Sequence, residues 1–197
     1  YGNSGNCMSQ FSVQSACEMP GSTKALCVTL LLQGLYYENG KMRTAMNVSG
    51  SQWGSGVADR VTIELHDADD YSGIALSLEN VNLSTDGRAI AAVPSCCAGS
   101  YYLTVKHRNS IETVSKFPVS FSADTIKYEF DTPVKACGDN LLLKDGRFMV
   151  YSGDVNQDGF IDSADMTPPD NLFVIPAGGY IPEDVNGNGR IDSGDIE

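Results

Sequence analysis

Short apolar segments separated by turn residues follow one another from Leu26 to about residue 150. In VTIELHD, residues 61–67, apolar and polar residues alternate, which places them on opposite faces of a β-strand. Glycine-containing turns at residues 85–87, 98–100 and 144–146 separate neighbouring segments. No stretch before residue 150 has the 3.6-residue period of an amphipathic helix. The pattern therefore predicts strands joined by turns.

Eight segments have this character: LCVTLLLQGLYY, VTIELHD, IALSLENV, GRAIAAVP, SYYLTVKHR, FPVSFS, TIKYEF and NLLLKDGRFMVY. Short strands at this spacing predict an all-β fold, an antiparallel sandwich of the immunoglobulin-like type, over residues 26–150. Residues 1–25 are rich in Gly, Ser and Asn and are predicted to form an irregular lead-in. Residues 151–197 differ in composition and are predicted to form a third part of the chain.

Hydrophobic residues make up 42% of the chain, which is enough for a folded core. No run of eighteen apolar residues occurs, so we expect no membrane span. The first ten residues lack the basic start and apolar stretch of a signal peptide. Either a signal peptide has been removed or the chain was cut from a longer protein, and the sequence leaves both open.

Acidic residues are concentrated at the C-terminal end. The formal net charge is −12, and residues 151–197 contain ten acidic residues and one basic residue, Arg190. Such clustering repels phosphate backbones, so we expect no nucleic-acid partner. It favours cations instead, or a solvated acidic tail. A solvated tail would not be expected to contain apolar residues such as Phe160, Ile161 and Ile191, so cation binding is favoured over a solvated tail.

The acidic residues belong to two near-copies of one twelve-residue motif, DVNQDGFIDSAD at residues 154–165 and DVNGNGRIDSGD at residues 184–195. Side-chain oxygens stand at positions 1, 3, 5, 9 and 12, glycine stands at position 6, and position 7 can offer its backbone carbonyl. This is the ligand pattern of an EF-hand type calcium loop. The predicted ligands of the first Ca²⁺ are Asp154, Asn156, Asp158, Phe160, Asp162 and Asp165. The predicted ligands of the second are Asp184, Asn186, Asn188, Arg190, Asp192 and Asp195.

Calcium takes six to eight oxygen ligands, and ligands on alternate residues let a short loop wrap one ion. Magnesium is the weaker candidate because it keeps more of its water. The first loop offers four carboxylates and the second three, because Asn188 replaces Asp at position 5. We therefore expect the first site to bind calcium more tightly, and we expect calcium to be needed to fold residues 151–197.

Six cysteines stand at positions 7, 17, 27, 96, 97 and 137. An even number without a CxxC pair predicts disulfides in an oxidising compartment, although six cysteines allow fifteen pairings and buried thiols remain an alternative. A zinc site is disfavoured because the two histidines, His66 and His107, have no ligand-like spacing to cysteine.

No catalytic motif is present: the chain lacks a GxSxG elbow, an HExxH helix and a phosphate-binding glycine loop. His66 and His107 are interpreted as solvated strand residues. Asp69 and Asp70 could form a carboxylate pair or hold a third cation, but they stand in a turn-like stretch. The chain is therefore predicted not to be an enzyme. Trp53, the only tryptophan, is either a stacking platform for a sugar or a partner, or a side chain folded onto the sandwich edge.

The duplicated loops resemble those of dockerins, which read D-x-N-x-D-G-x-I-x-x-x-D and end in Asp. This resemblance, over residues 154–195, implies a calcium-folded module that docks onto a cohesin-type scaffold. The helices that follow dockerin loops are missing here: Pro168 and Pro169 stop the first helix, and the chain ends two residues after the second loop. Docking to cohesin by the usual mode is therefore not expected.

A second stretch, TDGRAIAAVPSCCAGSYYLTVKHRNSIETVS at residues 85–115, resembles transthyretin-like modules such as carboxypeptidase regulatory domains and the B-type repeats of bacterial adhesins. That resemblance implies a rigid spacer or presentation sandwich. A sandwich followed by dockerin-like loops is also similar to the X-module–dockerin pairs of cellulosomes.

These observations together predict a non-catalytic, secreted or cell-surface module that binds two Ca²⁺ ions. It would attach a protein partner, or cap a larger surface protein as a structural terminus beside neighbouring domains. The alternatives are a carbohydrate-binding module of a polysaccharide-degrading system that uses Trp53 with Tyr36 and Tyr37, and dockerin-type docking to a cohesin-like scaffold. A small hydrolase that uses carboxylates is a further, disfavoured interpretation.

Overall fold

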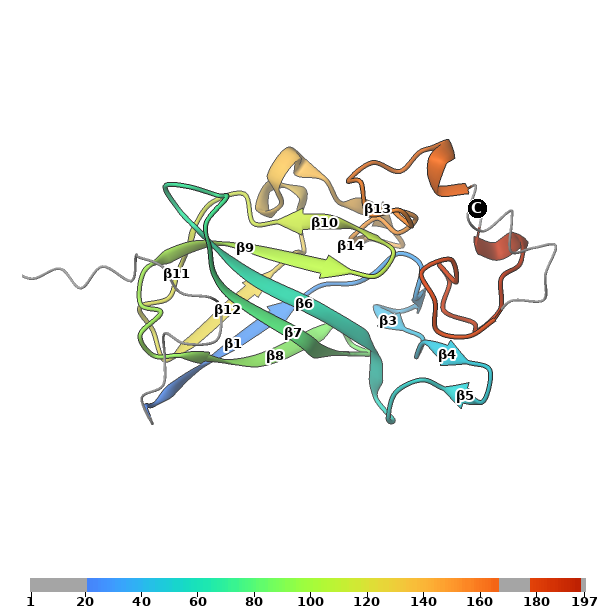
Figure 1. Cartoon of the computed structure of the whole chain (residues 1–197), viewed down its shortest axis with the longest axis horizontal. Helices are drawn as coiled ribbons and strands as arrows, with labels where there is room; N and C mark the ends of the chain where they lie inside the picture. Colours follow the sequence, from blue (N-terminus) through green and yellow to red (C-terminus); the bar gives the residue numbers. More distant parts are fainter. Residues whose placement is uncertain (1–20, 167–177, 196–197) are drawn as a thin grey trace, which may run out of the picture.

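The computed structural model describes residues 21–166 and 178–195, and most of these residues form β-strands (Figure 1). The strands are β1 (Thr23–Thr29), β2 (Tyr36–Glu38), β3 (Lys41–Met42), β4 (Met46–Asn47), β5 (Gly50–Ser51), β6 (Val57–Asp67), β7 (Ile74–Ser84), β8 (Arg88–Pro94), β9 (Ser100–His107), β10 (Ser110–Val114), β11 (Val119–Ser120), β12 (Thr125–Glu129), β13 (Leu142–Lys144) and β14 (Arg147–Met149). Short 3-10 helices occur at η1 (Pro133–Lys135), η2 (Cys137–Asp139) and η3 (Ser193–Asp195), and residues 163–166 are helical. The predicted all-β fold is confirmed.

One large sheet runs in the order β10-β9-β6-β7-β8-β1-β12, with β11 paired to β9. A single residue pair, Leu83 with Ala89, joins β7 to β8, so the sheet bends there into two layers. Figure 1 shows β6, β9 and β10 lying across β1 and β8. Buried side chains from both layers belong to one apolar cluster, which includes Leu26, Ile63 and Leu103. The arrangement is a β-sandwich with its core between the layers.

Two features of the sandwich differ from the sequence prediction. Neighbouring strands of the large sheet are antiparallel, as predicted, except β1 and β12, which pair in parallel. Strands β3 to β5 and β10 were not among the predicted segments; β3, β4 and β5 are two residues long, too short to show a recognisable period. Strand β1 also begins at Thr23, so residues 23–25 of the predicted lead-in are strand.

Strand β6 shows what alternation can predict. Ile63 and Leu65 are fully buried in the core, as expected. The opposite face is not open to solvent, because Glu64 and His66 are also buried. The ring of Tyr71 stacks on His66 at a centroid distance of 4.2 Å and covers this face. The interpretation of His66 as a solvated residue is therefore wrong.

None of the helices in the described ranges is long and apolar enough to cross a membrane.

Candidate metal centre

The two acidic loops fold in the same way, position by position. In both, the carboxylate at position 1 accepts hydrogen bonds from the backbone N–H groups of positions 5 and 6, at 3.1 and 3.2 Å for Asp154 and at 3.0 and 2.9 Å for Asp184. The carboxylate at position 12, Asp165 or Asp195, accepts from the N–H groups of positions 3 and 9 at 2.9–3.1 Å. The same twelve-residue motif therefore gives the same closed loop twice.

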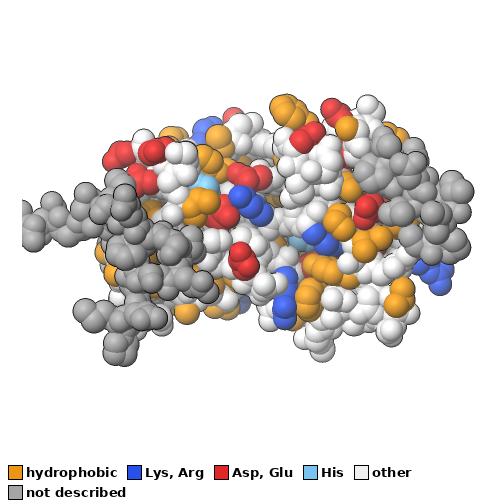
Figure 2. All heavy atoms as spheres, viewed as in Figure 1, with side chains coloured by type: hydrophobic (Ala, Val, Ile, Leu, Met, Phe, Trp, Pro, Cys, Tyr) orange, Lys and Arg blue, Asp and Glu red, His pale blue; other side chains and the backbone are white. Residues whose placement is uncertain are grey.

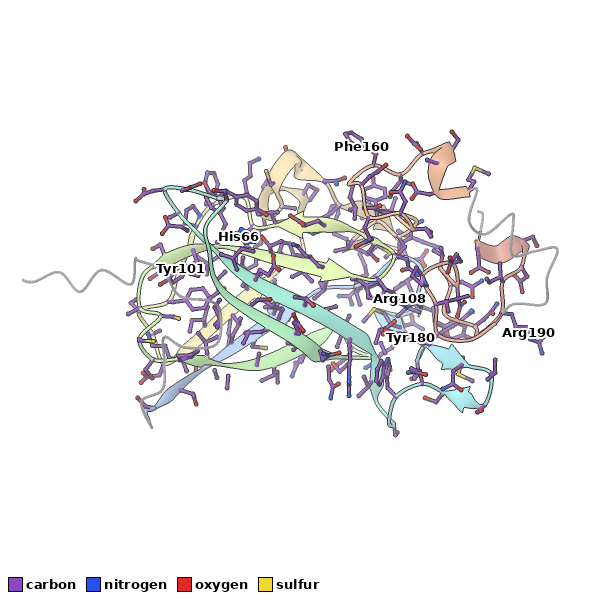
Figure 3. All side chains as sticks on the ribbon, viewed as in Figure 1. His66, Tyr101, Arg108, Phe160, Tyr180 and Arg190 are labelled. Atoms are coloured by element: carbon purple, nitrogen blue, oxygen red, sulfur yellow. The ribbon has the colours of Figure 1, made fainter. Side chains whose placement is uncertain are left out.

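Position 6 explains why the motif contains glycine. Gly159 has a φ of +87° and Gly189 a φ of +81°, in the left-handed region that glycine adopts without strain. Position 7 follows this bend, and Figure 3 shows the side chains of Phe160 and Arg190 pointing away from the body of the protein. Each of these residues could therefore serve a metal through its backbone carbonyl only, as the sequence predicts.

The carboxylates at positions 1 and 12, the first and last positions of each loop, are buried. Asp154 and Asp184 are 1% and 0% exposed, and Asp165 and Asp195 are 4% and 7% exposed. Burial raises the pKa of Asp154 and of Asp195, and it raises the pKa of Asp184 to about 6. Among the ion pairs of residues 21–166 and 178–195, none involves these four carboxylates. Buried carboxylates without a cationic partner are unfavourable unless a cation neutralises them.

The side chains at positions 3, 5 and 9 bond within their own loops. Asn156 donates to Asp158 at 3.0 Å, and Asn188 donates to Asp192 at 3.4 Å. In the described part of the chain, no three His, Cys, Asp or Glu side chains are gathered as metal ligands. The predicted ligand residues lie in two loops of the same form, with the carboxylates at positions 1 and 12 accepting hydrogen bonds from backbone N–H groups, and metal binding stays a prediction.

The second loop is fastened to the sandwich by residues of the β9–β10 turn. Nη1 of Arg108 donates to the backbone carbonyls of Ile181 and Asp184, the latter at 2.7 Å. Nδ2 of Asn109 donates to the carbonyls of Pro182 and Asp184 at 2.9 and 3.1 Å. These four bonds hold the start of the loop, whose first predicted ligand is Asp184.

Close backbone contacts hold the remainder of the second loop. The N–H of Met46 donates to the carbonyl of Gly187 at 2.9 Å. A Cβ at Gly34 would lie 2.2 Å from the backbone oxygen of Val185, so only glycine allows this approach. Figure 1 shows this loop beside β3 and β4, far from the N-terminal end of β1.

The first loop contacts the same end of the sandwich. The N–H of Gly153 donates to the carbonyl of Asn109 at 2.7 Å, and Oγ of Ser152 accepts from the N–H of Gly34 at 3.0 Å. Asn109 and Gly34 therefore each contact the second loop and the two residues that precede the first loop, so both loops are attached at the same end of the sandwich.

A buried carboxylate beneath this surface was not predicted. Asp59 is fully buried and accepts hydrogen bonds from five groups: Trp53 Nε1, the N–H of Arg60, His107 Nε2, Arg108 Nε and the hydroxyl of Tyr180. Burial opposes the charge of Asp59, but His107 and Arg108 outweigh it and hold the pKa below its usual range. The signal was present in the sequence: Asp59 follows Val57 and precedes Val61 and Ile63 on the apolar face of β6.

Trp53 is folded onto the sandwich edge rather than presented as a platform. The guanidinium carbon of Arg60 lies 4.0 Å from the centroid of its ring, and the ring contacts Tyr180 edge-on at 5.3 Å. Tyr36 is buried and Tyr37 lies under Arg43, so the three aromatic residues proposed for sugar binding do not share one surface.

The remaining candidates have structural roles. His107 is buried and bonds Asp59 at 3.1 Å, so its interpretation as a solvated residue is wrong. Of the predicted carboxylate pair, Asp70 accepts a hydrogen bond from the N–H of Ser72, and the N–H of Asp69 donates to Asp67, as in ordinary Asx turns. Cys96 is disulfide-bonded, whereas Cys27 and Cys137 are thiols. An oxidising compartment remains a prediction.

Comparisons with known proteins give little further guidance. No protein-family profile matches the chain, and no curated protein matches it. One similar solved structure is described as an N-terminal interface mutant of a type II cohesin-X-dockerin complex from Acetivibrio cellulolyticus. The TM-score is 0.47 and the sequence identity 15%, over 88% of this chain and 90% of that chain. At that level of similarity, the chain is not assigned to a family.

Proposed function

We propose that the chain is a non-catalytic extracellular module in which two Ca²⁺ ions close the acidic loops and fasten them to one end of the β-sandwich. The observation that carries this proposal is the repeated pair of buried carboxylates, at positions 1 and 12 of each loop, which form no ion pair with any described residue. A divalent cation bound by oxygen ligands would neutralise them.

The donor set fits calcium better than other metals. Every predicted side-chain ligand is a carboxylate or an amide oxygen, and the sequence motif supplies neither thiolate nor imidazole. Hard cations prefer such ligands, whereas zinc prefers sulfur and nitrogen. Asp154, Asp158, Asp162 and Asp165 would hold the first ion together with Asn156 and the carbonyl of Phe160. The corresponding residues 184–195 would hold the second.

The role of the module follows from where the loops lie. The second loop and the residues just before the first loop contact Asn109 and Gly34 at one end of the sandwich, so calcium would rigidify that end as a unit. A rigid end of this kind suits a secreted or cell-surface protein in which the module attaches a protein partner or caps neighbouring domains. The carbohydrate-binding alternative is not favoured, because Arg60 already covers one face of the Trp53 ring on which a sugar would stack.

Calorimetric titration of the calcium-stripped chain tests the proposal. We expect two sites for Ca²⁺, of which the first loop binds more tightly because it has four carboxylates. Asp154→Asn should remove one site and Asp184→Asn the other, while Mg²⁺ should bind each site more weakly. Glu79→Gln, outside both loops, is the matched control and should retain both sites. Absence of calcium binding, or equal binding by all four proteins, would contradict the proposal.

A further inference from the structure

The described residues also enclose a cavity of about 330 Å³ beside the acidic loops. Its walls come from three parts of the chain: strands β6 and β7, the end of β9, and the acidic segments, which contribute Gln157 and Tyr180. Three basic residues, Arg60, Lys106 and Arg108, line it, and no acidic residue does. The lining is therefore basic, in a chain with a net charge of −12.

Figure 2 shows the setting: blue Lys and Arg side chains gather near the centre of this face, around a pale-blue histidine. Figure 3 places Arg108 and Tyr180 next to one another at the edge of the sheet. The cavity therefore lies where the sandwich meets the C-terminal segment.

Both guanidinium groups of the cavity, those of Arg60 and Arg108, are held in place by aromatic rings. Arg60 stacks on Trp53 at 4.0 Å, and Arg108 stacks on Tyr180 at 4.7 Å. The two rings contact each other edge-on at 5.3 Å, so all four side chains form one cluster. A guanidinium that is already ordered loses less conformational entropy when it binds an oxyanion.

The guanidinium groups also have unused hydrogen-bonding capacity. Arg60 donates through Nε to Asn82 at 3.1 Å, and among the described residues it forms no ion pair. Nη2 of Arg108 is buried and has no hydrogen-bond acceptor in the described part of the chain. Lys106 and Arg108 already have acidic partners: Glu64 and Glu112 lie 2.8 and 3.4 Å from Nζ of Lys106, and Asp59 lies 3.3 Å from Nε of Arg108. The uncompensated positive charge is therefore that of Arg60.

We propose that this cavity binds an oxyanion, such as the carboxylate or sulfate group of a small ligand, through the stacked guanidinium groups of Arg60 and Arg108. Charge-assisted bonds from guanidinium to carboxylate or sulfate are among the stronger hydrogen bonds in proteins. Recognition relies on charge, because Arg60 already covers a face of the Trp53 ring.

Trp53 makes the test direct, because it is the only tryptophan of the chain and it lines the cavity. The protein is titrated with sodium glucuronate and with sodium sulfate, and Trp53 fluorescence is recorded at constant ionic strength. Glucose and sodium chloride are the matched neutral and simple-salt controls. We expect saturable changes with an oxyanion and none with the controls. Saturation by both oxyanions supports a general site, and saturation by one of them identifies the preferred group.

Variants assign the signal to the cavity. Arg60→Gln should weaken binding by roughly tenfold or more, because one charge-assisted contact is lost. Arg60→Lys keeps the charge but not the planar fork and should give an intermediate affinity. Arg43→Gln is the control, since Arg43 stacks on Tyr37 away from this cavity. Thermal unfolding verifies that each variant is folded. A response that glucose reproduces, that fails to saturate, or that is unchanged in folded Arg60→Gln would overturn the proposal.

Discussion

At the scale of single residues, Asp59 links the sandwich to the C-terminal segment. Its two oxygens accept from Trp53 and Tyr180 on one side and from His107 and Arg108 on the other. Arg108 in turn holds the backbone of the second loop. A carboxylate with this many donors is stable when buried because each lone pair has a partner.

Asp59→Asn keeps the shape of the side chain but removes the charge that His107 and Arg108 face. We expect the free energy of unfolding to fall by about 3–5 kcal/mol, the usual cost of breaking a buried ion pair. Urea denaturation measures this change. Asp86→Asn is the control, because Asp86 and Arg88 form an exposed pair 3.8 Å apart and its loss should cost at most about 1 kcal/mol. Equal effects of the two substitutions would show that Asp59 has no special role.

His107 gives a prediction for pH. Burial lowers the pKa of His107 below its ordinary value, although the bond to Asp59 opposes this effect. Below about pH 6.5 the unfolded chain takes up a proton on His107 that the folded protein does not. The free energy of unfolding should therefore decrease as the pH falls from 7 to 5, by at most about 1.4 kcal/mol per pH unit for this group.

Chemical denaturation at several pH values measures that slope. Asp184 acts in the opposite direction when no metal is bound, because its pKa is raised to about 6. The useful quantity is therefore the difference in slope between the parent protein and His107→Gln. A smaller decrease in the variant is expected, and identical slopes would exclude His107 as the cause.

At the scale of elements, the sequence predicted where most of the longer strands lie, but not which strands pair or which side chains cover them. Alternation located β6, and turn residues separated β7, β8 and β9, because these signals are local. The parallel pairing of β1 with β12 and the covering of Glu64 by Lys106 depend on residues far apart in the sequence. The two acidic loops share one backbone form because the twelve-residue motif contains its own hydrogen-bonding partners, and the metal that they are predicted to bind stays a prediction.

The attachment of the loops to the sandwich could not be predicted from the sequence, because no local pattern marks Gly34, Arg108 or Asn109 as contacts of residues far along the chain. Gly34 stands in an apolar stretch and shows only a break in it. The burial of Asp59 was also not predicted, but it could have been, since a charged residue on an apolar strand face indicates a buried polar partner.

Gly34→Ala tests this attachment. The added Cβ would lie 2.2 Å from the backbone oxygen of Val185, so the second loop must move away. We expect a loss of about 1–3 kcal/mol, the usual cost of overpacking, measured by thermal or urea unfolding. Gly54→Ala is the matched control, because no atom lies within 4 Å of a Cβ there. If the two variants are equally stable, the second loop does not rest on Gly34.

At the scale of the whole molecule, the C-terminal segments complete one end of the sandwich. Tyr180 donates to Asp59, and Gln157 donates to the carbonyl of Ser110. The first loop begins at Asp154, shortly after β14 ends at Met149. The acidic loops and the oxyanion cavity therefore share their supporting residues. Calcium should stabilise more than the two loops themselves, because the β9–β10 turn carries bonds to both.

Hydrogen exchange of backbone amides, with and without calcium, tests this account most directly. We predict slower exchange on addition of Ca²⁺ at Asp158 and Gly159 in the first loop and at Asn188 and Gly189 in the second, with Met46 on the sandwich also protected through its bond to Gly187. Mg²⁺ at the same concentration should protect these amides less. Exchange that is unchanged by calcium in both loops would contradict the central claim that calcium closes them and fastens them to the sandwich.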